Sequence, residues 1–326
     1  MKAEILKMLR ENDGYVSGQQ LCEKFGVSRT AVWKVIGQLK EEGYQVEAVR
    51  NRGYRIIDSP DVMTEEELKS LVHTEWAGQN IVYYAETDST NIRAKLLGEE
   101  GAPHGTLAVA DMQSAGKGRR GRTWASSPGR SIYMSLLLKP DISPVKAPML
   151  TLVAACAVAK ALKTCTGLEI QIKWPNDIVV NGKKLAGILT EMSTEIDYIN
   201  YVVTGIGINV NIEQFPEEIK DTATSLFLET GNTVKRALVI AEIMRFYEIY
   251  YAKFMETKDL SLLQEEYNRL LVNRNREVRI LGVKETYKAY ALGINPSGEL
   301  LVRRQDGTQE VIYAGEVSVR GVYGYV

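Results

Sequence analysis

The spacing of apolar residues divides the first 58 positions into short helices and one hairpin. In AEILKMLREN (3–12) the apolar residues share one helical face, which predicts an amphipathic helix. The stretch VSGQQLCEKFGVSRTAVWKVIGQLKEEGY predicts two helices, with Ser17 and Ser28 as N-caps and Gly26 in the tight turn between them. QVEAVRNRGYRII then alternates apolar and polar residues around an Asn-Arg-Gly turn, as the two strands of a hairpin do. This order predicts a winged helix-turn-helix.

A second region begins after Pro60, with an acidic helix expected after Thr64. The apolar period then switches repeatedly between two and 3.6 residues, which predicts an α+β domain on a mixed sheet. Strands are expected at 80–87, 105–112, 131–139, 170–174, 184–192 and 201–210, and helices at 145–165, 235–257 and 259–271. From about residue 274, short strands with close turns predict a small β-barrel. We therefore expect three domains, at 1–60, 61–272 and 273–326.

Composition narrows the classes of protein that fit. The formal net charge of −1 over 326 residues means that nucleic-acid binding would come from a local patch. No run of about 18 apolar residues is present, so we expect no membrane-spanning helix. The charged first residues do not match a signal peptide, and three cysteines without a pairing pattern fit a reducing cytoplasm. Two histidines and no Cys-x-x-Cys argue against a structural zinc site.

Residues 116–124, GKGRRGRTW, combine three glycines, four basic residues and a tryptophan after an expected strand. Glycine amides can face an anion, and arginine forks match phosphate and carboxylate oxygens. Trp124 can stack on a ligand or pack in the core. Taken alone, the stretch fits a nucleic-acid patch, a solvated basic loop and a clamp for an anionic small molecule equally well.

Two further stretches favour the clamp. Lys173 ends an apolar strand in IQIKWPND, where it is either an edge-strand cation that opposes aggregation or a charge aimed into a site. GIGINVN ends another apolar strand with Asn209 and Asn211, whose amides can read a purine edge or a ribose. The phosphate-binding pattern G-x-x-x-x-G-K-[ST] is absent from the sequence, which excludes a P-loop enzyme.

Together, five stretches resemble the motifs of biotin protein ligases: TDSTN (87–91), GKGRRGRTW (116–124), KWPND (173–177), GKKLAGIL (182–189) and GIGINVN (205–211). With the winged helix and the small barrel, nearly the whole chain is similar to the bifunctional class of this family, in which the ligase is also the repressor of the biotin operon. The resemblance implies a class II synthetase-like catalytic domain and an SH3-like C-terminal barrel. One departure is Lys117, where the family has an arginine: the charge is kept, but the bidentate fork is lost.

The resemblance implies a reaction in two steps. The carboxylate of biotin attacks the α-phosphate of ATP, giving biotinyl-5′-adenylate and pyrophosphate. A lysine of a biotin carboxyl carrier protein then attacks the adenylate, and AMP leaves. Because both nucleophiles are substrates, the enzyme needs cations and alignment and no nucleophile of its own. A transcription factor that senses biotin or its adenylate without ligase turnover is the alternative, and a lipoate-type ligase is a third.

Matching family positions imply a role for each residue of the site. The catalytic cations would be Lys173, Arg119 and Arg122. The biotin-binding residues would be Ser89, Thr90, Asn91, Gln113, Gly116, Lys117, Gly118, Arg119, Lys173, Gly187 and Ile188. The adenylate-binding residues would be Arg119, Arg120, Arg122, Trp124, Asn176, Lys184, Asn209 and Asn211. Ser89 and Thr90 equally suit a helix cap. Mg²⁺ would bridge ATP oxygens, with Asp177 either a metal ligand or a structural hydrogen-bonding residue.

The winged helix implies operator DNA as a second partner, although the same shape can serve protein contact. The DNA-binding residues would be Ser28, Arg29, Thr30, Lys34, Arg50 and Arg52. Residues 1–58 hold ten Lys/Arg and eight Asp/Glu, so one copy neutralises few phosphates. We therefore expect a homodimer on DNA when the adenylate is bound.

Overall fold

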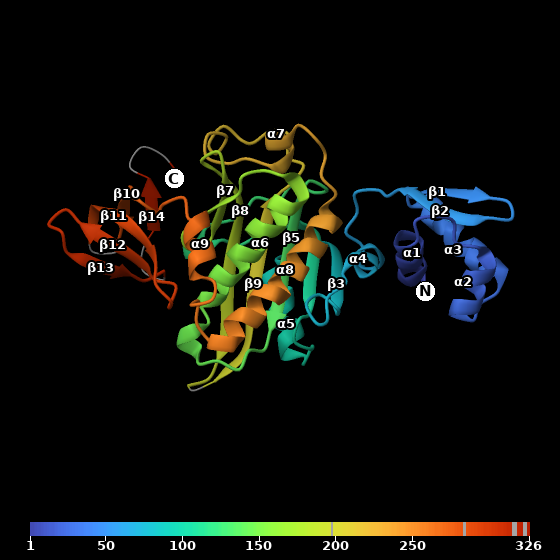
Figure 1. Cartoon of the computed structure of the whole chain (residues 1–326), viewed down its shortest axis with the longest axis horizontal. Coiled ribbons are helices and arrows are strands. Elements are labelled where there is room, and N and C mark those ends of the chain that lie inside the picture. Colours follow the sequence, from blue (N-terminus) through green and yellow to red (C-terminus); the bar gives the residue numbers. More distant parts are fainter. Residues whose placement is uncertain (197, 283–284, 315–317, 322–324) are drawn as a thin grey trace.

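The computed structural model describes residues 1–196, 198–282, 285–314, 318–321 and 325–326. Three parts follow one another along the long axis of the molecule (Figure 1). A helical part with a hairpin lies at one end, a large sheet with its helices lies in the middle, and a small sheet lies at the other end. This order follows the order of the three expected domains.

The first part is the winged helix-turn-helix that the sequence predicts. Its elements are α1 (Lys2–Glu11), α2 (Gly18–Phe25), α3 (Arg29–Glu41), β1 (Gln45–Val49) and β2 (Gly53–Asp58). Both expected caps are present: Ser17 forms a capping box with Gln20, and the Ser28 hydroxyl accepts from the amide of Ala31 at 3.2 Å. Gly26 ends α2 in the left-handed conformation, at φ 63°. This part has an apolar core of its own.

A seven-stranded mixed sheet forms the second part. Its spatial order is β3-β4-β5-β9-β8-β7-β6, where the strands are β3 (Ile81–Thr87), β4 (Leu107–Gln113), β5 (Ser131–Leu138), β6 (Gln171–Lys173), β7 (Asp177–Val180), β8 (Lys183–Thr194) and β9 (Ile199–Asn209). Strands β3 and β4 run parallel, and the other neighbouring pairs are antiparallel. The sequence predicted every strand except the four-residue β7. Asn181 and Gly182, at φ 49° and 79°, form the tight turn between β7 and β8, a conformation that an Asn-Gly pair favours.

Helices cover both faces of this sheet. They are α4 (Glu65–Leu71), α5 (Thr90–Glu99), α6 (Met149–Thr166), α7 (Leu226–Thr230), α8 (Arg236–Thr257) and α9 (Gln264–Leu270). Helices α6 and α8 cross one face side by side, over the main apolar core (Figure 1). Helix α5 covers the other face, where Ala94 packs with Ala108, Leu137, Tyr201 and Val203. Buried on both faces, β5 is a continuous apolar run apart from its two serines.

Among the described residues, one helical stretch, Pro144–Thr166, is long and apolar enough to cross a membrane, but 72% of its most apolar 18-residue window is buried inside the fold. It includes α6, which packs against α8 and against several strands of the sheet. Its apolar character is therefore explained by its place in the core.

The third part is a five-stranded antiparallel sheet in the order β13-β12-β11-β10-β14. Its strands are β10 (Arg276–Leu281), β11 (Thr286–Ile294), β12 (Leu300–Arg304), β13 (Gln309–Ile312) and β14 (Ser318–Gly321). Its apolar side chains, among them Val278, Ile280 and Val302, belong to the same buried cluster as the central core. Closure of these strands into an SH3-like barrel stays a prediction.

A buried carboxylate joins the winged helix to the central part. Glu67 on α4 is only 3% exposed. It accepts from the guanidinium of Arg10 at 2.6 Å and from the hydroxyl of Tyr44 at 2.7 Å, both in the winged helix. Burial and the bond to Glu67 raise the pKa of Tyr44. Charge-assisted hydrogen bonds therefore stabilise the contact between the winged helix and the central part.

A second buried network lies where the linker after β2 meets the central sheet. Arg236, at the start of α8, is 3% exposed and bonds to Asp61 at 2.9 Å and to Asp111 at 2.6 Å. The amide of Asn211, just beyond β9, also donates to Asp61, at 3.0 Å. Asp61 thereby fixes the end of the linker to two segments that are distant in sequence, and Arg236 extends the network to Asp111 on β4.

Candidate active site

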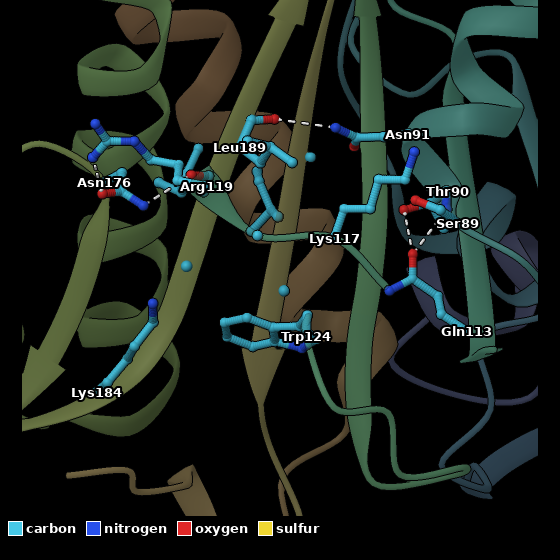
Figure 2. Close-up of a pocket in the computed structure, with 16 residues that line it drawn as sticks. Ser89, Thr90, Asn91, Gln113, Lys117, Arg119, Trp124, Asn176, Lys184 and Leu189 are labelled. Carbon is cyan, nitrogen blue, oxygen red and sulfur yellow. Dashed lines mark hydrogen bonds between the residues drawn. The ribbon is translucent and has the colours of Figure 1, made fainter. Parts of the chain in front are cut away.

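A cavity lies where the glycine-rich loop crosses β8 and β9. The N-terminus of α5, the end of β4, the loop and these strands contribute its lining: Ser89, Thr90, Asn91, Gln113, Lys117, Gly118, Arg119, Trp124, Asn176, Lys184, Gly187, Ile188, Leu189, Gly205, Ile206 and Gly207 (Figure 2). The cavity is partly open to solvent, and its volume is about 50 Å³. Small-molecule pockets commonly measure about 300–1,000 Å³. A ligand of ordinary size would therefore extend into the opening or displace the loop.

Trp124 lies against two strands because glycines stand beneath its ring. A Cβ atom on Gly187 would come within 2.8 Å of the ring, and one on Gly207 within 2.7 Å. Any side chain at either position would displace the indole. The ammonium of Lys184 lies 5.4 Å from the centre of the same ring (Figure 2). A flat aromatic face beside a cation suits a ligand that carries both a planar ring and negative charge.

One end of the cavity is lined by hydrogen-bonding groups, and the side chain of Lys117 points toward it (Figure 2). The side-chain oxygen of Gln113 accepts from the amide of Thr90 at 2.8 Å and from its hydroxyl at 3.1 Å (Figure 2). Behind them, the hydroxyl of Ser135 bonds to Thr90 at 2.8 Å and donates to Asn91 at 2.6 Å. This end offers fixed donors and acceptors to a neutral polar group.

Asn91 also connects the cavity to an ion pair outside it. Its amide donates to Glu191 at 2.7 Å, and Glu191 pairs with Lys95 at 2.5 Å. Burial alone would raise the pKa of Glu191, but the bonds from Lys95 and Asn91 outweigh it, and the pKa is lowered. The carboxylate thus stays charged and holds the orientation of Asn91.

The other end of the cavity is cationic. Lys184 pairs with Asp177 at 2.6 Å. The guanidinium of Arg119 donates to the side-chain oxygen of Asn176 at 2.8 Å and to the backbone carbonyl of Ala314 in the third part. Burial lowers the pKa of Arg119, with Asp177 opposing the shift. The loop is thereby attached both to the central sheet and to the third part of the chain.

Arg119 also separates this cavity from a second one, of about 220 Å³. Apolar residues dominate the second lining, which includes Pro148, Leu152, Pro175 and Met192. Because both cavities share Arg119, Ile188 and Leu189, the guanidinium forms part of the wall between them.

Three family models match the chain, one in each part. They are an HTH domain at residues 2–55, the Biotin/lipoate A/B protein ligase family at 83–209, and the Biotin protein ligase C terminal domain at 275–320. The proteins named "Bifunctional ligase/repressor BirA" from Bacillus subtilis and Bacillus spizizenii are each 44% identical over 309 residues, which cover 94% of this chain and 94% of theirs. The chain belongs to the bifunctional biotin ligase/repressor family.

A more distant relative and a solved structure agree with this membership. The Escherichia coli protein of the same name is 30% identical over 96% of this chain and 95% of its own length. The biotin protein ligase of Aquifex aeolicus, solved with biotin and ATP, superposes with a TM-score of 0.66 at 33% identity. That match covers 74% of this chain and 99% of the Aquifex chain. The relatives named here are biotin ligases, which does not favour the lipoate-type alternative.

The structure brings most of the expected ligase site together. Twelve of the expected residues line the cavity: Ser89, Thr90, Asn91, Gln113, Lys117, Gly118, Arg119, Trp124, Asn176, Lys184, Gly187 and Ile188. Ser89 occupies the N-cap position of α5, but its side chain makes no capping hydrogen bond within the described residues. The cavity adds Leu189, Gly205, Ile206 and Gly207, which the sequence analysis did not assign. Gly205 and Gly207 could have been found from the sequence, because they are the glycines of the GIGINVN motif.

Six expected residues do not line this cavity: Gly116, Arg120, Arg122, Lys173, Asn209 and Asn211. Arg120 and Arg122 are exposed on the loop. The amide of Asn209 donates to the carbonyl of Thr224 at 3.0 Å, and Asn211 bonds to Asp61 and to the backbone of Val234. Buried amides are held by backbone groups when no ligand reaches them, which gives both asparagines a structural role here.

Lys173 also lies apart from the cavity. Its side chain is 4% exposed, and its ammonium sits 3.4 Å from the centre of the Tyr325 ring. Lys184, eleven positions further along the chain and on β8, lines the cavity together with Lys117 and Arg119. The catalytic role that the sequence analysis gave to Lys173 stays a prediction.

Asp177 acts as a hydrogen-bonding residue in this structure. One of its oxygens pairs with the ammonium of Lys184 and accepts a hydrogen bond from the side-chain amide of Asn176. The other oxygen accepts a hydrogen bond from the hydroxyl of Tyr325 at 2.5 Å. Among the described residues, no group of three or more His, Cys, Asp or Glu is placed to hold a metal ion. These donors do not fit a dedicated Mg²⁺ site, so such an ion would be held mainly by substrate oxygens.

The expected DNA-binding residues gather on the outer side of the winged helix. Arg29, Thr30 and Lys34 are exposed on α3, and Ser28 is its N-cap. Arg29, Arg50 and Arg52 line one groove between α3 and the wing. Trp33, which the sequence analysis did not assign, is 69% exposed on the same helix. Its position four residues after Arg29 and next to Lys34 places it on the outward face.

Proposed function

We propose that this chain activates biotin with ATP, transfers it to a lysine of a biotin carboxyl carrier protein, and represses biotin genes when it holds the adenylate. The observation that carries the ligase proposal is a cavity with one end rich in hydrogen-bonding groups, beside Lys117, a second end with Lys184 and Arg119, and an indole between them. The ureido ring of biotin is neutral, and its carboxylate is charged. The cavity therefore suits both ends of biotin, and the indole of Trp124 suits the adenine ring of ATP.

In the first step, a carboxylate oxygen of biotin bonds to the α-phosphorus of ATP, and the bond to the β-phosphate oxygen breaks. Lys184 and Arg119 would draw the two anions together and stabilise charge on the α-phosphate oxygens as the bond forms. Thr90 and Gln113 would hold the ureido end. When bound with ATP, Mg²⁺ would supply further neutralisation of the phosphates.

In the second step, the carrier amine attacks the acyl carbon, and AMP leaves with the acyl–oxygen bond electrons. The loop would shield the mixed anhydride from water until the carrier docks. Purified protein with biotin and ATP should release pyrophosphate, retain the adenylate, and then label a carrier domain. Retention of the adenylate without any transfer would support the sensing alternative.

We predict that Arg119→Gly releases biotinyl-adenylate into solution. The change removes the bonds to Asn176 and Ala314 and opens the wall between the two cavities. Loss of charge-assisted bonds of this kind should accelerate adenylate dissociation on the order of tenfold to a hundredfold. Dissociation can be timed by chasing labelled adenylate from a filter-bound complex.

Arg120→Gly is the matched control, because Arg120 is exposed on the same loop and does not line the cavity. Free adenylate made by the Arg119 variant should also label unrelated lysines in a bystander protein. Tight retention and strict carrier labelling by this variant would contradict the clamp.

We also propose that the adenylate promotes a homodimer on operator DNA. A ligand that orders the loop removes an entropic cost from dimerisation, so the two events become positively linked. We predict tighter self-association and tighter operator binding with the adenylate than without it. Sedimentation and operator titration at fixed salt measure both, and equal values in the two states would refute the linkage.

A variant lacking residues 1–60 is the control for the dimer. Its central sheet keeps its own core, so it should retain carrier labelling while losing the operator. The cytoplasm, where carrier protein and DNA meet, is the proposed compartment.

We predict that Trp33 reads a thymine in each half-site. Exposed apolar side chains on a recognition helix can contact the thymine methyl group in the major groove. Duplexes selected from a random library by the wild type should show a thymine preference that Trp33→Ala loses and Trp33→Phe keeps. Lys34→Ala should instead weaken binding to all sequences and reduce its salt dependence. An unchanged preference in Trp33→Ala would exclude this contact.

A further inference from the structure

Glu191 on β8 holds the cavity residue Asn91 from outside the cavity, which Glu191 itself does not line. The side-chain nitrogen of Asn91 donates to Glu191 at 2.7 Å and, at the longer distance of 3.3 Å, to the carbonyl of Leu189 (Figure 2). On the side of β9, a Cβ atom on Gly205 would come within 2.0 Å of the side-chain oxygen of Asn91. The amide is therefore confined between two strands, with its nitrogen toward the carboxylate.

The charge on Glu191 decides which end of this amide faces it. An ionised carboxylate only accepts hydrogen bonds, so the nitrogen of Asn91 fits against it and the oxygen does not. Burial opposes ionisation, but the bonds from Lys95 and Asn91 and the charges of Lys95 and Lys117 lower the pKa of Glu191. Glu191 is therefore charged at neutral pH, and the oxygen of Asn91 is turned away from it.

One buried hydroxyl passes the orientation of Asn91 on to Thr90. Ser135 on β5 lies 2.6 Å from the side-chain oxygen of Asn91 and 2.8 Å from the hydroxyl of Thr90. A hydroxyl has one proton, and an amide oxygen only accepts, so the proton of Ser135 points to Asn91. Ser135 is then an acceptor toward Thr90.

The second neighbour of the Thr90 hydroxyl is also an acceptor. The side-chain oxygen of Gln113 lies 3.1 Å from this hydroxyl, and its identity as the oxygen follows from the backbone amide of Thr90, which donates to it at 2.8 Å. Neither Ser135 nor Gln113 donates to the Thr90 oxygen. That oxygen therefore presents lone pairs to the cavity, as an acceptor for an N–H group of a ligand.

We propose that Glu191 is a positioning residue for biotin: through Asn91 and Ser135 it fixes the direction of these hydrogen bonds, so that Thr90 accepts from a ureido N–H. This inference rests on the proposed function, which places the ureido ring at this end. Without the carboxylate, Asn91 can turn its nitrogen toward Ser135, whose proton is then free to point to Thr90. Thr90 can donate to the ligand instead, and the preference for a ring that offers N–H is lost.

The test compares biotin with its two cyclic carbamate analogues, in each of which one ureido N–H is replaced by a ring oxygen. Calorimetry should show that the wild type binds one carbamate about a hundredfold more weakly than biotin, because its ring oxygen faces the lone pairs of Thr90. Glu191→Leu should weaken biotin binding about tenfold and reduce this discrimination about tenfold. Glu191→Gln, whose amide oxygen can still accept from Asn91, should keep both within about threefold of the wild type.

Glu99→Leu is the control. Glu99 is an exposed carboxylate at the far end of α5, where it accepts from the hydroxyl of Tyr201 at 3.2 Å and does not line the cavity. This variant should bind biotin and both carbamates as the wild type does. The side chain of Glu191 is itself 28% exposed, so its replacement should leave the fold intact, which circular dichroism checks.

Two further readouts separate this route from general damage to the site. In a Ser135→Ala background, Glu191→Leu should cost less than about twofold in biotin affinity, because Ser135 is the step through which Glu191 acts. In NMR spectra without ligand, the side-chain amide protons of Asn91 should be protected from exchange in the wild type and in Glu191→Gln, and should exchange faster in Glu191→Leu.

Unchanged discrimination in Glu191→Leu, an equal cost with and without Ser135, or unchanged exchange of the Asn91 protons would overturn the proposal. Wild-type protein that discriminates among the three ligands as expected but releases no pyrophosphate with ATP would overturn the proposed ligase function alone.

Discussion

Replacing Lys184 with methionine is expected to slow adenylate formation by about a hundredfold, with much less change in the affinity for biotin. Lys184 is the lysine whose ammonium lies between Trp124 and Asp177 at the cavity. A preorganised cation that stabilises charge in the transition state contributes on the order of 3 kcal/mol. Methionine keeps most of the length of the side chain and removes the charge. Rapid-quench measurement of pyrophosphate release separates this effect from product release.

Two neighbouring lysines provide the comparison. Lys183→Met, one position earlier, removes a side chain that donates to the carbonyl of Lys220 away from the cavity, and should leave the rate within about twofold. Lys173→Met tests the assignment made from the sequence. A larger loss for Lys173→Met than for Lys184→Met would restore Lys173 as the catalytic cation and contradict the assignment of Lys184.

Replacing Arg236 with methionine is expected to lower the free energy of unfolding by roughly 3 kcal/mol, because it leaves two partly buried carboxylates and two backbone carbonyls without their donor. The Arg236 guanidinium, 3% exposed, pairs with Asp61 and Asp111 and also donates to the backbone carbonyls of Asp61 and Ser131. Urea unfolding followed by circular dichroism measures the change. Since Asp61 ends the linker, operator binding should weaken as well.

Arg245→Met is the matched control on the same helix. Its guanidinium pairs with Glu242 at 2.7 Å, but its side chain is 48% exposed. An exposed ion pair of this kind contributes about 0–1 kcal/mol. Equal losses in the two variants would show that burial of Arg236 adds nothing to its ion pairs.

Local signals explain where the sequence predicted the fold well. The caps at Ser17 and Ser28, the left-handed Gly26 and the Asn181-Gly182 turn act within a few residues, so the sequence alone is enough to place them. The long strands were predicted because their apolar runs are continuous. The four-residue β7 was missed because so short a run between motif residues carries little periodicity.

The site was predicted as a set of motifs, and the sequence does not decide which member of a motif lines the cavity in this structure. Lys173 and Lys184 both stand in matching motifs, and only the pairing of β6, β7 and β8 decides which ammonium reaches the cavity. Asn211 is likewise turned to Asp61, 150 residues away in sequence. Such choices depend on contacts between distant segments, and local pattern does not contain them. Trp33 could have been found from its position on the helix, and Glu191 could not.

The separation of the apolar cores has a consequence for how such proteins change over evolutionary time. The winged helix keeps its own core and meets the rest of the chain through polar contacts such as those of Glu67. The C-terminal sheet shares one continuous core with the catalytic sheet. A lineage can therefore gain or lose the whole winged-helix domain, and transcriptional control with it, with few compensating changes in the catalytic domain. The C-terminal sheet, in contrast, must be inherited together with the catalytic sheet.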